Sequence, residues 1–188
     1  LESLEAIDAF DAIVIDVRDN GGGNNSNSTD IANRFADESR TVGFYRYRSG
    51  PDHGDFTPPR PIGISPAGVR FQAPVAVLCN RRCASATEDF LLRMRAIPGV
   101  LMIGDTSMGA VGNPIQRELA NGWSYQLSEW MILTSQMEQI EDAGLVPDIA
   151  VPATLADSSS NADRALERAV NELRARRTTS ARRSTTPP

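Results

Sequence analysis

The sequence contains no lysine, because all 19 of its basic residues are arginine, and it contains a single histidine, His53. The absence of lysine excludes any mechanism in which a lysine of this chain acts as the general base. A mechanism that requires histidine must use His53 or a residue outside these 188 positions.

Cysteine is almost as scarce, since Cys79 and Cys83 are the only two. Two thiols without a histidine nearby in the sequence are too few ligands for a zinc site. We interpret them as small buried side chains, and a local disulfide is the alternative if the protein lives outside the cytoplasm. The segment that contains Asp16 and Asp19 resembles a calcium loop in its Asp, Asn and Gly content, but the glutamate required at the twelfth position of such a loop is absent. We therefore expect no metal and no other cofactor.

Long apolar runs are also missing. No stretch approaches the roughly 20 residues that a membrane-spanning helix needs, and the first residues do not resemble a signal peptide. We expect no membrane insertion of this segment. The net charge of −5 argues against a nucleic-acid-binding face. Because the chain opens without Met inside a predicted helix at residues 3–10, we expect it to be a fragment of a longer polypeptide.

The composition that remains is typical of one globular domain. Hydrophobic residues make up 40% of the chain, which is enough for a core of useful size. We expect that core domain to occupy residues 1–176. The last residues, 177–188, consist of Arg, Ser, Thr, Ala and Pro, and their composition predicts a disordered tail.

Several short segments have the pattern of β-strands. Residues 12–17 and 74–79 are apolar runs without polar alternation, which is typical of strands covered on both faces. Further strands are expected at 100–104 and 146–151. Residues 125–134 alternate more clearly and predict an antiparallel or edge strand.

Helices are expected between these strands. One is predicted from 85 to about 96, and another over 161–176, where apolar residues recur at helical spacing. Ser28 or Thr29 resembles the N-cap of a third helix that runs to about residue 37. The stretch 49–66 is rich in Pro and Gly and predicts a long loop. Strands that alternate with helices in this way indicate an α/β domain.

Four short motifs carry a family resemblance. They are Ile-Asp-Val-Arg-Asp-Asn-Gly-Gly-Gly at 15–23, Asn-Arg-Arg-Cys-Ala-Ser-Ala-Thr-Glu at 80–88, Gly-Asp-Thr-Ser-Met-Gly at 104–109, and Gly-Leu-Val-Pro-Asp at 144–148. In this order and spacing they resemble the S41 family of serine peptidases, which includes tail-specific (C-terminal-processing) and tricorn-core enzymes. The resemblance covers about residues 12–151. It implies a crotonase/ClpP-like spiral of βαβ units.

The resemblance identifies Ser85 as the nucleophile. This serine stands where a buried strand turns into a helix, and unpaired N–H groups of the first helical turn face that position. The N–H of Ala86 would be one oxyanion donor, and a glycine of the run 21–23, Gly22 or Gly23, would be the second. The alternative for Ser85 is the N-cap serine of an ordinary helix.

The chain departs from the family in its general base. Tail-specific members use a Ser/Lys pair, and Ala110 stands at the matching lysine position. Tricorn-core members use a histidine upstream of the glycine motif, which would precede Leu1, and an assisting glutamate whose place Glu141 fits. His53 is the only base candidate inside the chain, although its Pro/Gly loop is unlike the histidine segment of the family. The alternative for His53 is an exposed loop histidine, and the alternative for Glu141 is a surface carboxylate.

Two functions follow from these residues. The first is a serine endopeptidase core that cuts peptides or unfolded proteins, with a histidine base from outside this segment; the segment alone would then be inactive. The second is a non-catalytic module that binds a ligand or peptide on the same fold. The sequence leaves an oligomeric assembly open. Because relatives are often exported, we expect a periplasmic or secreted location.

Overall fold

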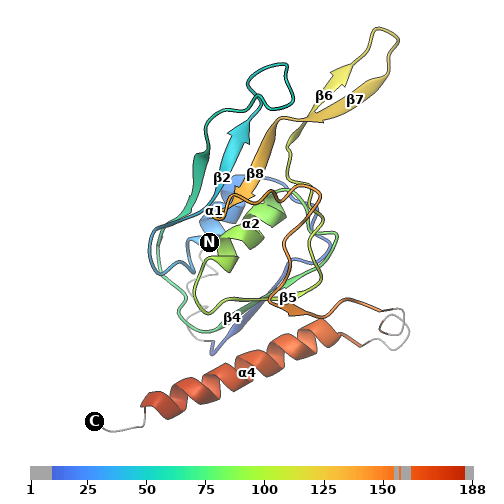
Figure 1. Cartoon of the computed structure of the whole chain (residues 1–188). Helices are drawn as coiled ribbons and strands as arrows, with labels where there is room; N and C mark the ends of the chain where they lie inside the picture. Colours follow the sequence, from blue (N-terminus) through green and yellow to red (C-terminus); the bar gives the residue numbers. More distant parts are fainter. Residues whose placement is uncertain (1–9, 155–156, 158–161, 185–188) are drawn as a thin grey trace.

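The structure is a computed structural model that describes residues 10–154, 157 and 162–184. Side chains are described as far as residue 176. The predicted helix at 3–10 lies outside the described residues except for its last position. Three sheets and the helices that pack against them make up most of the described part (Figure 1).

A four-stranded parallel sheet forms the base of the fold. Its strands, in the order β1-β4-β5-β9, are β1 (Ile13–Asp16), β4 (Val75–Cys79), β5 (Leu101–Gly104) and β9 (Ile149–Ala150). All neighbours pair in parallel. These are the four strands expected from the apolar runs; β1, β4 and β5 are each one or two residues shorter than the run, and β9 keeps only two of the six residues expected at 146–151. A parallel sheet combined with helices confirms the α/β class.

The burial of strand β4 on both faces explains why its sequence does not alternate between apolar and polar residues. Val75, Val77 and Cys79 pack into a core on one face of the sheet, together with residues of α1 (Asn25–Ala32) and α2 (Ala86–Arg95). The residues between them, Ala76 and Leu78, pack into a second core on the other face. Both faces are covered, so that every position of the strand is buried.

Helix α4 (Arg164–Ser184) covers that second face, and Figure 1 shows it lying along β4 and β5. It continues to Ser184 through part of the segment where the composition predicts a disordered tail, and residues 185–188 lie outside the described ones. Arg18 links the beginning of this helix to the sheet, because its guanidinium donates to Asp163 at 2.7 Å and to Asp16 at 2.6 Å. These hydrogen bonds lower the pKa of both carboxyl groups.

The expected start of α1 was wrong. Asn24 is its N-cap, and the Asn24 side chain accepts a hydrogen bond from the N–H of Ser26. The hydroxyls of Ser28 and Thr29 donate instead to the carbonyl of Asn25, one turn earlier, so both residues lie inside the helix. The helix also ends earlier than expected, at Ala32.

An antiparallel sheet covers the far side of α2. It consists of β3 (Arg60–Ile64), β2 (Arg40–Tyr47) and β8 (Trp130–Thr134), in that order. Strand β3 corrects the expectation of an uninterrupted loop at 49–66. Its Pro61 and Gly63 are tolerated because β3 pairs on one side only, with β2.

The expected single strand at 125–134 is two strands. Strand β7 (Ser124–Ser128) pairs with β6 (Pro114–Glu118) in a hairpin, whereas β8 joins β2 in the antiparallel sheet. In Figure 1 the hairpin projects from the body of the molecule. No helix of the described residues is long and apolar enough to cross a membrane.

Candidate active site

Ser85 has an unusual backbone conformation. It stands at the N-cap of α2 with φ 55° and ψ −124°, a region that costs a residue with a side chain about 1–3 kcal/mol. Its side chain makes no capping hydrogen bond, unlike an ordinary N-cap serine. Its N–H donates to the carbonyl of Ala110 at 2.9 Å, which holds the strained residue in place. Strain of this kind is concentrated at functional sites.

The glycine run lies directly against this serine. A Cβ added to Gly22 would come within 2.7 Å of the Ser85 Cβ and 3.0 Å of the Ala86 nitrogen, so no larger residue fits there. Gly22 also has φ +107°, which favours glycine. Asn20 joins the two segments, because its side chain accepts from the Gly22 N–H at 3.0 Å and its carbonyl accepts from the Ala84 N–H at 3.2 Å.

Two backbone N–H groups remain available at this junction. Ala86 is the first residue of α2, so that no carbonyl within the helix can accept a hydrogen bond from its N–H. Within the described part of the chain, no hydrogen bond from the N–H of Ala86 or of Gly23 is found. Both residues line the same cleft, which has a volume of about 190 Å³. Its apolar lining is made by Ile15, Val17, Ile31 and Phe90.

Cys83 is close to Ser85 in the same turn but is not equipped to react. Its side chain is fully buried, and burial raises the pKa of the thiol. Its sulfur donates to the carbonyl of Val17 at 3.1 Å. Cys79 is also buried, with a pKa raised to about 12, and both cysteines are free, so the alternative of a local disulfide was wrong. A buried thiol of raised pKa is inert, so that neither cysteine is a candidate nucleophile of this turn.

Glu88 has a role at the site that the sequence analysis did not assign. It lies in the first turn of α2 and is fully buried. One carboxylate oxygen accepts from the hydroxyl of Ser107 at 2.6 Å and from the N–H of Gly109 at 2.7 Å. The other accepts from the N–H of Ala110 at 2.8 Å. Glu88 therefore fixes the 104–112 turn against the helix that begins after Ser85. Its place three residues after the serine was visible in the sequence, but its burial was not.

Glu141 contacts the same turn from a segment that comes later in the sequence. Its carboxylate accepts from the N–H of Val111 at 2.8 Å, and the Trp130 indole donates to the Val111 carbonyl at 2.6 Å. Val111 follows Ala110, whose carbonyl binds the Ser85 N–H. The half-buried Glu141 therefore lies at the edge of the serine site.

His53 lies in a different part of the structure. It is exposed in the loop between β2 and β3, where its carbonyl accepts a hydrogen bond from Arg48 at 2.8 Å. No hydrogen bond joins it to the residues around Ser85 in the described part of the chain. The described residues also include no group of three or more His, Cys, Asp or Glu side chains that could hold a metal ion.

The model of peptidase family S41 matches residues 1–151. The chain belongs to this family. Among the proteins of known sequence, the carboxy-terminal processing protease CtpA of Bacillus subtilis is 24% identical over 153 residues, which cover 79% of this chain and 31% of CtpA.

Solved structures agree with the family. A peptidase structure from Parabacteroides merdae has a TM-score of 0.84 and 38% identity, over 92% of this chain and 55% of that one. The tricorn protease has a TM-score of 0.62 and 22% identity, over 88% of this chain and 15% of that one. The chain therefore spans about half the length of the first structure and a third of CtpA.

Proposed function

We propose that this chain is the catalytic core of a serine endopeptidase, with Ser85 as its nucleophile. The observation that carries the proposal is the backbone of Ser85, held at φ 55° without a capping hydrogen bond. An ordinary N-cap serine gains stability by capping, whereas this serine bears strain and leaves its hydroxyl uncommitted. A strained turn between strand and helix is a known way to expose a nucleophile.

The proposed oxyanion donors are the N–H groups of Ala86 and Gly23. The N–H of Gly22 donates to the Asn20 side chain and is therefore not a proposed oxyanion donor. Gly22 is needed because it lacks a side chain, which allows the glycine turn to pack directly against Ser85. Attack by the Ser85 hydroxyl on a peptide carbonyl turns the carbonyl oxygen into an oxyanion, and two donors in a preorganised backbone stabilise it. Loss of one such donor typically costs about 2.7–4 kcal/mol of transition-state stabilisation.

The general base is proposed to come from outside these 188 residues. Ala110 occupies the lysine position of the tail-specific branch, and its side chain cannot accept a proton. A histidine from the remainder of the polypeptide would take the proton of Ser85 and pass it to the leaving amine, as in other serine peptidases. Glu141 is held at the edge of the site by Val111, from where it would orient that imidazole.

The proposed substrate is an unfolded protein or peptide. The cleft beside Ala86 is small, and the apolar part of its wall suits an aliphatic side chain next to the cleaved bond. We also propose that the complete fold is the crotonase/ClpP-like spiral and that the protein works outside the cytoplasm. A lipoprotein from Streptococcus agalactiae with 20% identity and a TM-score of 0.56 is among the similar structures. An oligomeric assembly remains a prediction.

The absence of a base near Ser85 in the described residues favours a second candidate, a peptide-binding module that does not cut. One experiment separates the two. The complete polypeptide is incubated with a quenched fluorescent unfolded protein, beside its Ser85→Ala variant and a Ser135→Ala control, in which an exposed serine is removed. We expect turnover that disappears only in Ser85→Ala. Well-folded protein without turnover would establish the binding module instead.

A second measurement tests the origin of the base. The isolated chain is expected to be inactive, because a serine without a base is a poor nucleophile. Turnover by the isolated chain that is abolished by His53→Ala would show that the base lies within it and would contradict the proposal.

A further inference from the structure

A large pocket lies at the edge of the parallel sheet opposite to Ser85. Strand β4 begins at this pocket, with Pro74 and Val75 in its wall, and ends ahead of the turn that carries Ser85. Val100, just before β5, lies in the same wall. The pocket volume is about 700 Å³, which is within the range of small-molecule sites, about 300–1,000 Å³. Nothing in the proposed peptidase mechanism uses it.

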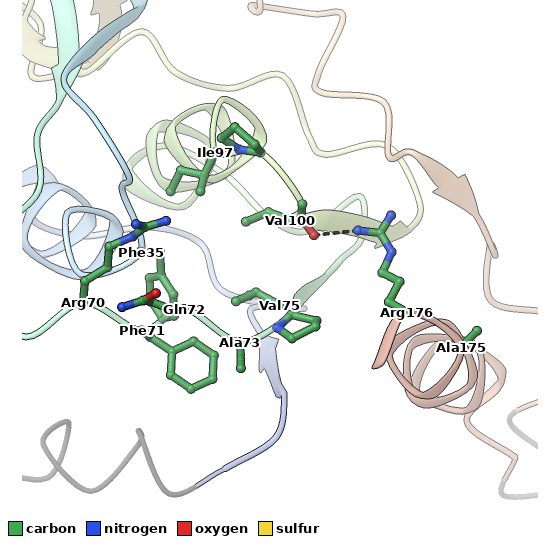
Figure 2. Close-up of a pocket in the computed structure, with 13 residues that line it drawn as sticks. Phe35, Arg70, Phe71, Gln72, Ala73, Val75, Ile97, Val100, Ala175 and Arg176 are labelled. Carbon is green, nitrogen blue, oxygen red and sulfur yellow. Dashed lines mark hydrogen bonds between the residues drawn. The ribbon is translucent and has the colours of Figure 1, made fainter. Parts of the chain in front are cut away.

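The walls of the pocket are mainly apolar. Phe35 and Phe71 pack edge to face, with ring centroids 5.8 Å apart, and Ile97 and Val100 lie across from them. Figure 2 shows these side chains around the pocket, with residues of α4 at its far side. An apolar body of moderate size would be stabilised here by removal of its surface from water.

Two arginines give the pocket a positive charge. Figure 2 shows Arg70 and Arg176 on opposite sides of it. Among the described residues that line it there is no Asp or Glu, so that no carboxylate of this lining neutralises either charge. The Nε of Arg70 is buried and has no hydrogen-bond partner in the described part of the chain. Arg176 donates one N–H to the carbonyl of Gly99 at 2.7 Å, which positions a guanidinium that carries five such donors.

A buried donor without an acceptor is costly, and the cost is removed when a ligand supplies the acceptor. Arginine forks match the two oxygens of a carboxylate, and a charge-assisted bond of this kind is stronger than a neutral one. The apolar walls accept the rest of such a molecule. We propose that this pocket binds an apolar monocarboxylate, whose carboxylate lies at Arg70 and whose aliphatic or aromatic body lies between Phe71 and Val100, with Arg176 adding positive charge from the opposite side.

The test is calorimetric titration of the full chain with octanoate, below its micellar concentration. Octanamide, which has the same body without the charge, and acetate, which has the charge without the body, are the ligand controls. We expect saturable binding of octanoate, with octanamide and acetate each bound at least about tenfold more weakly. This readout does not depend on peptidase activity.

Variants locate the binding. Arg70→Gln is expected to weaken octanoate binding about tenfold, because it removes the charged donor to the carboxylate. Arg176→Gln is expected to weaken it less, because Arg176 adds its charge from across the pocket. Arg168→Gln is the matched control, since Arg168 lies on α4 and pairs with Glu172 away from the pocket. Arg70→Lys retains the charge and is expected to bind better than Arg70→Gln. Melting temperatures without ligand show whether each variant is folded.

The proposal is overturned by any of three results. These are the absence of saturable octanoate binding to the unchanged chain, equal affinity for octanoate and octanamide, and a folded Arg70→Gln variant that keeps full affinity.

Discussion

Replacement of Ser85 by glycine should make the protein more stable. At an ordinary N-cap, Ser→Gly costs a few tenths of a kcal/mol and Ser→Ala about 1 kcal/mol, because the capping hydrogen bond is lost. Ser85 makes no such bond and has φ 55°, so its side chain brings strain without the usual gain. Glycine relieves about 1–3 kcal/mol of strain but loses roughly 0.5–1 kcal/mol through the greater freedom of the unfolded chain. The net expectation for Ser85→Gly is a gain of about 0–2.5 kcal/mol, with a mid-range value of about 1 kcal/mol.

Ser85→Ala keeps the strain and removes an uncommitted hydroxyl, so we expect a change within about 0.5 kcal/mol. The assay is urea unfolding of the unchanged chain and both variants, with melting temperature as a check at about 2–4 °C per kcal/mol. Asn24→Ala is the control, because Asn24 caps α1 through the N–H of Ser26 at 2.9 Å and should lose about 1 kcal/mol. If Ser85→Gly is neutral or destabilising while Ser85→Ala loses as much as Asn24→Ala, then Ser85 is an ordinary cap and our reasoning fails.

Three further perturbations test the surroundings of the serine and the sheet. Gly22→Ala should abolish turnover of the complete polypeptide and lower the free energy of unfolding by about 1–3 kcal/mol, because the added Cβ would lie 2.7 Å from the Ser85 Cβ. Gly21→Ala is the control, because a Cβ added there meets nothing within 4 Å and should change neither turnover nor stability appreciably. Glu88→Gln places an amide donor against backbone N–H groups and should cost about 1–3 kcal/mol in urea unfolding, whereas exposed Glu118→Gln should change little. Arg18→Gln should lose stability of less than about 1 kcal/mol near neutral pH. Because the pKa values of its two aspartate partners are lowered on folding, the contribution of Arg18 to stability is present above about pH 4 and disappears as the pH falls through their folded pKa values. A difference in unfolding free energy between Arg18→Gln and the unchanged chain that persists in strong acid would refute this.

The parallel sheet was predictable because its signal is local. A strand covered on both faces needs apolar residues at every position, and the run Val-Ala-Val-Leu-Cys of β4 meets that need within the sequence itself. Helix α2 was predictable from its position, since a buried strand and a turn directly precede it in the sequence.

The elements that were missed depend on distant partners. Pro61 and Gly63 concealed β3, because only its position at the edge of a sheet makes these residues acceptable. The segment 125–134 divides because β7 pairs with the adjacent β6, whereas β8 pairs with β2, far away in the sequence. The cap of α1 was misplaced because several cap-forming residues occur together and only geometry selects Asn24.

The candidate site was predictable in its motifs but not in its supporting contacts. The serine, the small residues beside it and the glycine run could be located from the sequence. The strain at Ser85, the packing of Gly22 on it and the burial of Glu88 are properties of the folded backbone. The sequence also showed that Ala110 leaves the chain without a lysine base, and the structure puts the carbonyl of Ala110 on the Ser85 N–H.

The central claim is that Ser85 is an activated nucleophile. The most direct test is to treat the complete polypeptide with a fluorophosphonate and to locate the modified residue by peptide mass spectrometry. We predict that Ser85 is the residue modified, with labelling lost in Ser85→Ala and kept in Ser135→Ala. A polypeptide that cleaves its substrate while the label lies on another residue, or while Ser85 stays unmodified, would contradict the account.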